Sequence, residues 1–80
     1  MWRLTYNREA NNYVLDSYPY NEDILMAIES LALSEDGLPT SHCVELDDDY
    51  YLWLVAQHSV VFQRIVSSRE IRILIIKPDL

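Results

Sequence analysis

The chain has 80 residues, of which 50% are apolar and 24% are charged, an ordinary composition for one small globular domain. We therefore expect a single domain over residues 1–80. The formal net charge of −7 argues against a general nucleic-acid-binding protein, because an acidic body repels phosphate. The longest apolar run, Tyr50–Ala56, is far too short to cross a membrane.

The distribution of charge and the cysteine content indicate where a basic surface can lie and in which compartment the protein works. Residues 1–49 hold eleven acids and two arginines, a net charge of −9, whereas residues 50–80 hold two acids and four cations, a net charge of +2. Any basic surface therefore belongs mainly to the C-terminal part. Cys43 is the only cysteine, so no internal disulfide can form, and the first residues lack the pattern of a signal peptide. We expect a reduced, cytoplasmic protein.

The N-terminal half predicts one strand and two helices. Trp2–Tyr6 alternates in polarity, as a strand with one buried face does. Asn7 is a good N-cap for a helix over Arg8–Ser17, and Asn21 can cap a second helix that ends before Gly37. The apolar positions of these helices recur at helical spacing; they are Ala10, Tyr13 and Val14, and then Ile24, Leu25, Ile28, Leu31 and Ala32.

The C-terminal half predicts an antiparallel meander, because its apolar runs are short and the joints between them, Gln57-His58 and Ser68-Arg69, fit only hairpin turns. Tyr50–Ala56 is apolar on both faces, so we expect a central strand covered at least partly on both sides. The three acids 47–49 lack the spacing of a calcium loop and predict a solvated turn. The expected strands are His42–Leu46, Tyr50–Ala56, Ser59–Ser67 and Ile71–Lys77.

The register of the last hairpin decides how two arginines lie. A two-residue turn at Ser68-Arg69 would place Ile65 opposite Arg72 and point Arg64 and Arg72 to opposite faces, each at a sheet margin or paired with a carboxylate such as Glu70. A three-residue joint would pair the two arginines on one face. We expect the first register. The predicted fold is α+β, with an N-terminal strand and a two-helix hairpin packed on the C-terminal antiparallel meander.

This order of elements resembles the RelE/ParE toxin superfamily over nearly the whole chain. The opening Trp2–Tyr6, followed by Asn7-Arg-Glu-Ala and Asn11-Asn12-Tyr13, resembles its first strand and helix. The segment Asp23–Ala32 resembles its second helix. Leu46 to Ile76, with Tyr50-Tyr51-Leu-Trp, His58-Ser-Val-Val-Phe and Ile71-Arg-Ile-Leu-Ile, is similar to its sheet.

The resemblance implies the toxin half of a type II toxin–antitoxin pair, in a cytoplasmic bacterial or archaeal setting, with a cognate antitoxin that wraps the toxin. RelE-like members cut mRNA in the ribosome without a metal, and ParE-like members poison gyrase. The resemblance therefore implies no cofactor and no metal ion. A small domain with several strand and helix edges suits such wrapping.

Metal-free RNA cleavage needs cations on the phosphate, a base for the 2′-hydroxyl and an acid for the leaving oxygen. The chain departs from the family where such residues are expected: Ser59 replaces an arginine, His42 and Glu45 replace basic residues, and the basic tail is reduced to Lys77. The candidates that remain are Arg64, Arg72 and Lys77 on the phosphate, with His58 or Tyr51 in proton transfer.

Three functions stay open at this point. The first is a RelE/ParE-like mRNA endonuclease that uses these candidates. The second is a non-catalytic module on the same fold, either a decayed toxin or a protein-binding domain, and the acidic helical half favours it because only four cations oppose repulsion from ribosomal phosphate. The third is a structural homodimer that pairs exposed strand edges.

Overall fold

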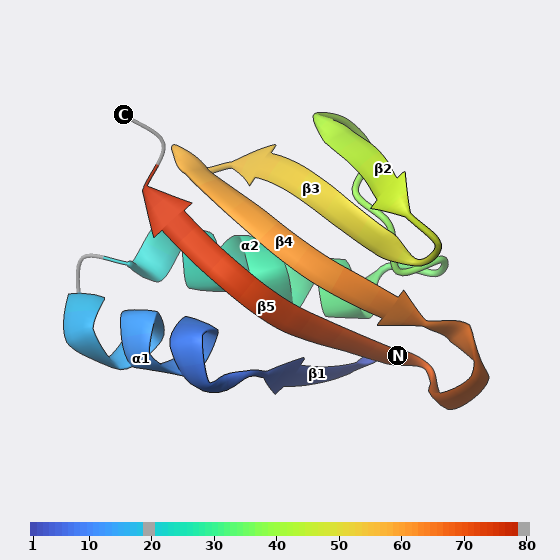
Figure 1. Ribbon diagram of the computed structural model, residues 1–80, viewed down its shortest axis with the longest axis horizontal. Helices are drawn as coiled ribbons and strands as arrows, with labels where there is room; N and C mark the ends of the chain where they lie inside the picture. Colours follow the sequence, from blue (N-terminus) through green and yellow to red (C-terminus); the bar gives the residue numbers. More distant parts are fainter. Residues whose placement is uncertain (19–20, 79–80) are drawn as a thin grey trace.

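The structure, a computed structural model, describes residues 1–18 and 21–78. Within these residues two helices lie on one side of a five-stranded sheet; in Figure 1, α2 lies behind the strands and α1 lies at the lower left, below β5. The predicted α+β class is confirmed. The elements are β1 (Arg3–Tyr6), α1 (Arg8–Ser17), α2 (Glu22–Leu33), β2 (Cys43–Asp47), β3 (Tyr50–Val55), β4 (His58–Ile65), the 3₁₀ turn Val66–Ser68 and β5 (Glu70–Pro78).

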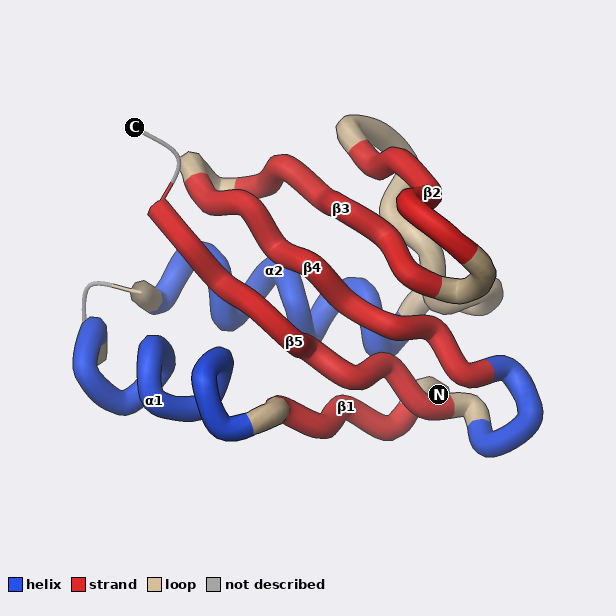
Figure 2. The backbone as a smooth tube through the Cα atoms, in the orientation of Figure 1, coloured by secondary structure: helices blue, strands red, loops and turns tan. Residues whose placement is uncertain are grey.

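The strand order across the sheet is β1-β5-β4-β3-β2, which Figure 2 shows as one continuous layer. Strands β2 to β5 pair antiparallel with their sequence neighbours, as the short joints predicted. Strand β1 pairs parallel with β5, so the first and last strands of the chain lie side by side. The two helices carry the chain from β1 to β2 at the opposite edge of the sheet, and the antiparallel strands then return it to β5 beside β1.

The two helices begin differently, although asparagine precedes both. The Asn7 side chain accepts a hydrogen bond from the Ala10 backbone amide at 3.0 Å, as predicted for an N-cap. Asn21 is the N-cap residue of α2, as predicted, but its side chain makes no capping hydrogen bond. Its Nδ2 instead donates to the Val14 carbonyl at 2.6 Å, and the residue is 1% exposed. Asn21 therefore ties the start of α2 to the end of α1.

Both hairpin joints differ from the prediction. The β3–β4 turn is Ala56-Gln57, both with positive φ, so it falls one residue earlier than expected and His58 belongs to the strand. The β4–β5 joint has four residues, and Arg69 closes it in the left-handed conformation at φ 51°. The expected two-residue turn is wrong because Val66–Ser68 forms a 3₁₀ turn.

The longer joint sets a register in which Arg64 lies opposite Ile71, and Arg72 opposite Gln63. Neither register considered from the sequence occurs. The two arginines nevertheless lie on opposite faces of the sheet, as expected, because side chains alternate along a strand and Ile71 is buried under the helices.

Strand β3 is covered on one face only, and β4 takes the central position. Trp53 is 8% exposed and joins the core, whereas Leu54 on the opposite face is 45% exposed. The expectation of cover on both sides is therefore wrong, because both helices of the described chain lie on the same side of the sheet. The buried core consists of Trp2, Ala10, Ile24, Ile28, Leu31, Ala32, Trp53, Val60, Phe62, Ile71, Ile73 and Ile76.

Candidate functional site

The five residues predicted to carry chemistry lie at separate places on the sheet. Arg64 and His58 are at opposite ends of β4, six residues or roughly 20 Å apart at about 3.4 Å per residue. Arg72 and Lys77 lie on β5, on the face without helices, and Tyr51 faces the core from β3. No common centre brings these side chains together.

Arg64 binds the loop that follows α2. Its Nε donates to the Asp36 carbonyl at 2.7 Å, and its guanidinium lies 5.1 Å from the centre of the Trp2 ring. The guanidinium of Arg69 lies 4.7 Å from the same ring and donates to the Glu35 carbonyl at 3.5 Å. Stacking on the indole and bonds to backbone carbonyls give both arginines a structural explanation.

Trp2 is the centre of this arrangement. It is 2% exposed, and its Nε1 donates to the Glu35 carbonyl at 3.3 Å. A Cβ on Gly37 would come within 2.6 Å of the Trp2 ring, and Gly37 has φ +69°. Only glycine fits both the space and the backbone conformation. The loop after α2 is therefore closed over Trp2, with the two arginines at the ring.

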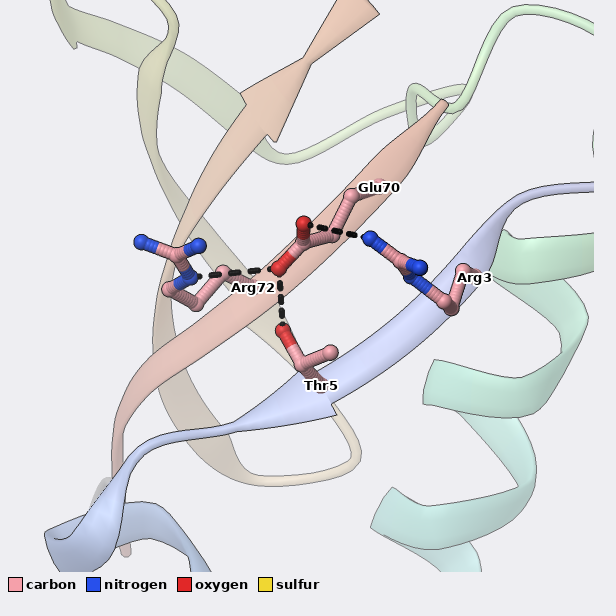
Figure 3. Close-up of polar contacts among 4 residues, drawn as sticks. All are labelled: Arg3, Thr5, Glu70 and Arg72. Atoms are coloured by element: carbon pink, nitrogen blue, oxygen red, sulfur yellow. Dashed lines mark hydrogen bonds and ion pairs between the residues drawn. The ribbon is translucent and has the colours of Figure 1, made fainter. Parts of the chain in front are cut away.

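Arg72 is held by Glu70, together with Arg3 and Thr5 from β1 (Figure 3). Glu70 Oε2 accepts from Arg72 Nε at 3.2 Å and from the Thr5 hydroxyl at 2.7 Å, and Oε1 accepts from an Arg3 guanidinium nitrogen at 3.1 Å. Glu70 is 5% exposed beneath these groups. Pairing of Arg72 with a carboxylate such as Glu70 was one of the two expected outcomes; the contributions of Arg3 and Thr5 were not predicted.

The hydrogen bond from the Thr5 hydroxyl is the largest cause that lowers the pKa of Glu70. Burial opposes it, and the bonds and charges of Arg3 and Arg72 lower the pKa further. Glu70 is thus a carboxylate at neutral pH and neutralises one of the two arginines beside it. A phosphate at Arg72 would have to compete with this internal anion.

His58 has both ring nitrogens engaged. Nδ1 lies 2.7 Å from the Ala56 carbonyl, which can only accept, so Nδ1 carries the proton. Nε2 lies 2.7 Å from the Tyr13 hydroxyl, which then donates to it. The Tyr13 and His58 rings also meet edge to face, with centroids 5.6 Å apart. His58 therefore connects α1 to the β3–β4 turn, and its basic nitrogen is already in use.

Tyr51 and Lys77 lie apart from each other, one packed against the core and the other exposed. Tyr51 stacks on Phe62 with ring centroids 5.3 Å apart, which makes it a partly buried core aromatic. Lys77 is exposed opposite Ser59, five residues or about 15 Å along β5 from Arg72. Neither side chain is placed to act on a phosphate with Arg64.

The face of the sheet opposite the helices, here named the open face, is ordered in rows that the register defines. One row is entirely apolar and crosses four strands: Ile75, Val61, Leu52 and Val44. The next row toward the β2–β3 turn is polar at its ends: Arg72, Gln63, Tyr50 and Asp47. Val44 is 60% exposed and Leu54, next to the apolar row, is 45% exposed.

A shallow groove of about 320 Å³ lies on the other side, between α2 and β3. Apolar and hydroxyl-bearing residues of α2, residues 38–42 and the end of β3 line it, and His42 is its one titratable lining residue among the described part of the chain. No lysine or arginine of the described residues lines it. Nearby Cys43 is partly buried, which raises the pKa of its thiol.

In residues 1–18 and 21–78, no three histidine, cysteine or acidic side chains form a group that could hold a metal ion. The acids 47–49 stand at the β2–β3 turn, where the Asp47 carboxylate accepts from the Asp48 amide. No helix of the described chain is long and apolar enough to pass through a membrane.

Comparison of the chain with protein-family models, with curated proteins and with solved structures gives no match. The contacts that sequence reasoning missed are those of Arg3, Thr5 and Tyr13. Each of these residues lies more than 40 positions from its partner in the sequence, so no local pattern could predict the contact.

Proposed function

We propose that the chain is a RelE/ParE-like domain that acts by binding a protein partner, the non-catalytic form of a toxin-type module in the cytoplasm. One observation carries this choice: the three candidate cations, Arg64, Arg72 and Lys77, are dispersed over the described residues, and two of them, Arg64 and Arg72, are engaged within the fold. Arg64 is bonded to the loop after α2, and Arg3 and Arg72 share Glu70. Metal-free cleavage depends on cations that converge on one phosphate.

The order of elements supports the same proposal. A strand, two helices and an antiparallel meander are what the resemblance implies, and the described chain has this order. In such a pair the partner is an antitoxin segment that wraps its toxin. The net charge of −7 requires that this segment be basic.

The free edge of β2 is the place where such a segment would bind. β2 is last in the strand order, and four of its five residues are exposed. Its backbone can accept an added strand, and Glu45 and the acids 47–49 surround that edge with negative charge. A partner segment with alternating apolar and basic residues would match both features.

The first experiment tests catalysis. The purified chain, incubated with mRNA in a translating extract, should leave the transcript intact, and its expression alone should not arrest growth through RNA loss. Ribosome-dependent cleavage that Arg72→Ala abolishes would overturn the proposal and restore the endonuclease. Arg8→Ala, a substitution of an exposed arginine on α1, is the matched control.

The second experiment tests the partner. The protein encoded by the neighbouring reading frame should copurify with the chain and bind more weakly as salt rises. Replacing Glu45 and the acids 47–49 by their amides should weaken binding at least tenfold, as expected for losing several complementary charges. The same change at four helix acids should have little effect; these controls are Glu9, Asp16, Glu22 and Asp23. Equal loss in both sets would contradict binding at β2.

A further inference from the structure

We infer that the open face of the sheet binds the open face of a second copy of this chain. This inference goes beyond the proposed function, because it uses the open face and leaves the outer backbone edge of β2 accessible; the two surfaces share only the acids of the β2–β3 turn. The first observation is the apolar row Ile75, Val61, Leu52 and Val44. A contiguous apolar patch of this kind on a small domain indicates an interaction surface.

The second observation is the charge at the two ends of the neighbouring polar row. The β5 end carries Arg72, with Arg3 and Glu70 beside it, a net charge of +1. The β2 end carries Asp47, next to the two further acids of the β2–β3 turn. Positive and negative groups therefore lie at opposite ends of one row on one face.

A two-fold axis in the interface, parallel to the strands and between β3 and β4, makes these ends complementary. It places β5 of one copy over β2 of the other and β4 over β3, while each row stays over its own counterpart. Arg72 of each copy then faces Asp47 of the other, and Val61 of each copy faces Leu52 of the other, so that each pair occurs twice in the dimer. Sheets that pack face to face at about −30° keep their strands close to this alignment.

The alternative axis, across the strands, is unfavourable. It would turn the row of Arg72 over the row of Lys77, so cations on β5 would face each other. Pairing of two β2 edges is unfavourable as well, because Glu45 and the acids 47–49 of both copies would come together. The charges thus select one arrangement of the two copies.

The size of the face sets the expected affinity. The four overlapping strands, β5 to β2, lie about 4.8 Å apart and span roughly 14 Å, and six-residue strands extend about 20 Å. The area of overlap is therefore well below the roughly 800 Å² per partner of a standard interface. We therefore expect a weak dimer that dissociates upon dilution.

The experiment is sedimentation of the full chain across micromolar to millimolar concentration. The mass should rise from the 9.4 kDa of one chain to twice that value. Val61→Glu, in the centre of the apolar row, should abolish the dimer, and Asp47→Arg should raise the dissociation constant about tenfold or more. Asp16→Arg on α1 makes the same charge change away from the face and should leave it unaltered.

A mixing test is specific to the two-fold axis. Asp47→Arg and Arg72→Glu should each weaken the dimer alone, and an equimolar mixture of the two variants should regain it, because both cross-copy pairs are then oppositely charged. If Arg72→Glu fails to fold, dilution-dependent NMR shifts of the β3 and β4 amides in the native chain provide the second readout. A monomer at all concentrations, or a dimer indifferent to Val61→Glu and Asp47→Arg, would overturn the inference.

Discussion

The two faces of the sheet are built from the same strands but differ in how tightly their side chains are packed. On the helix side, Val60, Phe62, Ile71 and Ile73 are all 0% exposed. On the open face, the neighbours along β4, Ser59, Val61 and Gln63, remain partly exposed, and on β5 Arg72 is exposed. Polar groups also differ: on the open face four residues satisfy one another around Glu70, whereas on the helix side isolated bonds such as Tyr13 to His58 join separate elements. Because both faces carry apolar residues, the apolar content of a strand does not by itself show which face belongs to the core.

Adjacent residues on β4 provide the strongest test of this difference. Phe62→Ala should lower the free energy of unfolding by about 3–5 kcal/mol, since it leaves a cavity in the core. Val61→Ala on the open face should cost less than about 1 kcal/mol, as surface substitutions do. Urea unfolding at low protein concentration measures both. Equal losses would mean that the open face is packed as tightly as the helix side.

Gly37→Ala tests the closure of the helix side at its margin. The positive φ and the collision with Trp2 should together cost about 2–4 kcal/mol, from backbone strain and overpacking. Thermal unfolding of Gly37→Ala in the Trp2→Ala background should show a smaller loss than in the native background, because the ring no longer obstructs the Cβ. An identical loss in both backgrounds would assign the whole effect to the backbone.

Tyr13→Phe removes one buried polar connection of the helix side. Losing the hydroxyl that donates to His58 should cost about 1 kcal/mol. Tyr18→Phe, at an exposed tyrosine just after α1, is the control and should cost almost nothing. Chemical denaturation measures the free energy of unfolding of the native chain and the two variants. An unchanged value for Tyr13→Phe would show that His58 finds another donor.

Glu70 gives the smallest effect and a pH dependence on the open face. Its pKa is lowered in the folded state, so its contribution is present above the unfolded value of about 4.3 and is lost as pH falls through the lower folded value. Glu70→Gln should flatten this part of the stability profile. Glu9→Gln on exposed α1 should not. Unfolding measured from neutral to acidic pH checks the sign; greater stability in acid would contradict it.

Much of the local structure followed from short-range patterns. The bounds of α1, the Asn7 cap and the apolar stripe of α2 depend on residues within a few positions, and each is found as predicted. Strand limits shifted by one or two residues, because turn geometry depends on conformations such as the positive φ of Ala56 and Arg69. The four-residue joint before β5 has no glycine or asparagine to announce it.

The candidate site was less predictable. Its residues were chosen by chemical type, and the ion pair of Arg72 with Glu70, two positions apart, was within reach of local reasoning. The stacking of Arg64 on Trp2 and the bond from Tyr13 to His58 join positions 62 and 45 residues apart in the chain. Only the folded arrangement brings these groups together.

The sequence by itself determined the α+β class, the two helices, the antiparallel meander and the separation of an acidic half from a weakly basic one, because periodicity, capping and charge are properties of neighbouring residues. The tertiary structure alone decided that β1 lies against β5, that both helices cover the same side, and that β3 leaves Tyr50 and Leu54 exposed on the open face. These features depend on which distant surfaces meet, and hydrophobic burial is non-directional, so apolar content specifies how much surface must be covered but not which face.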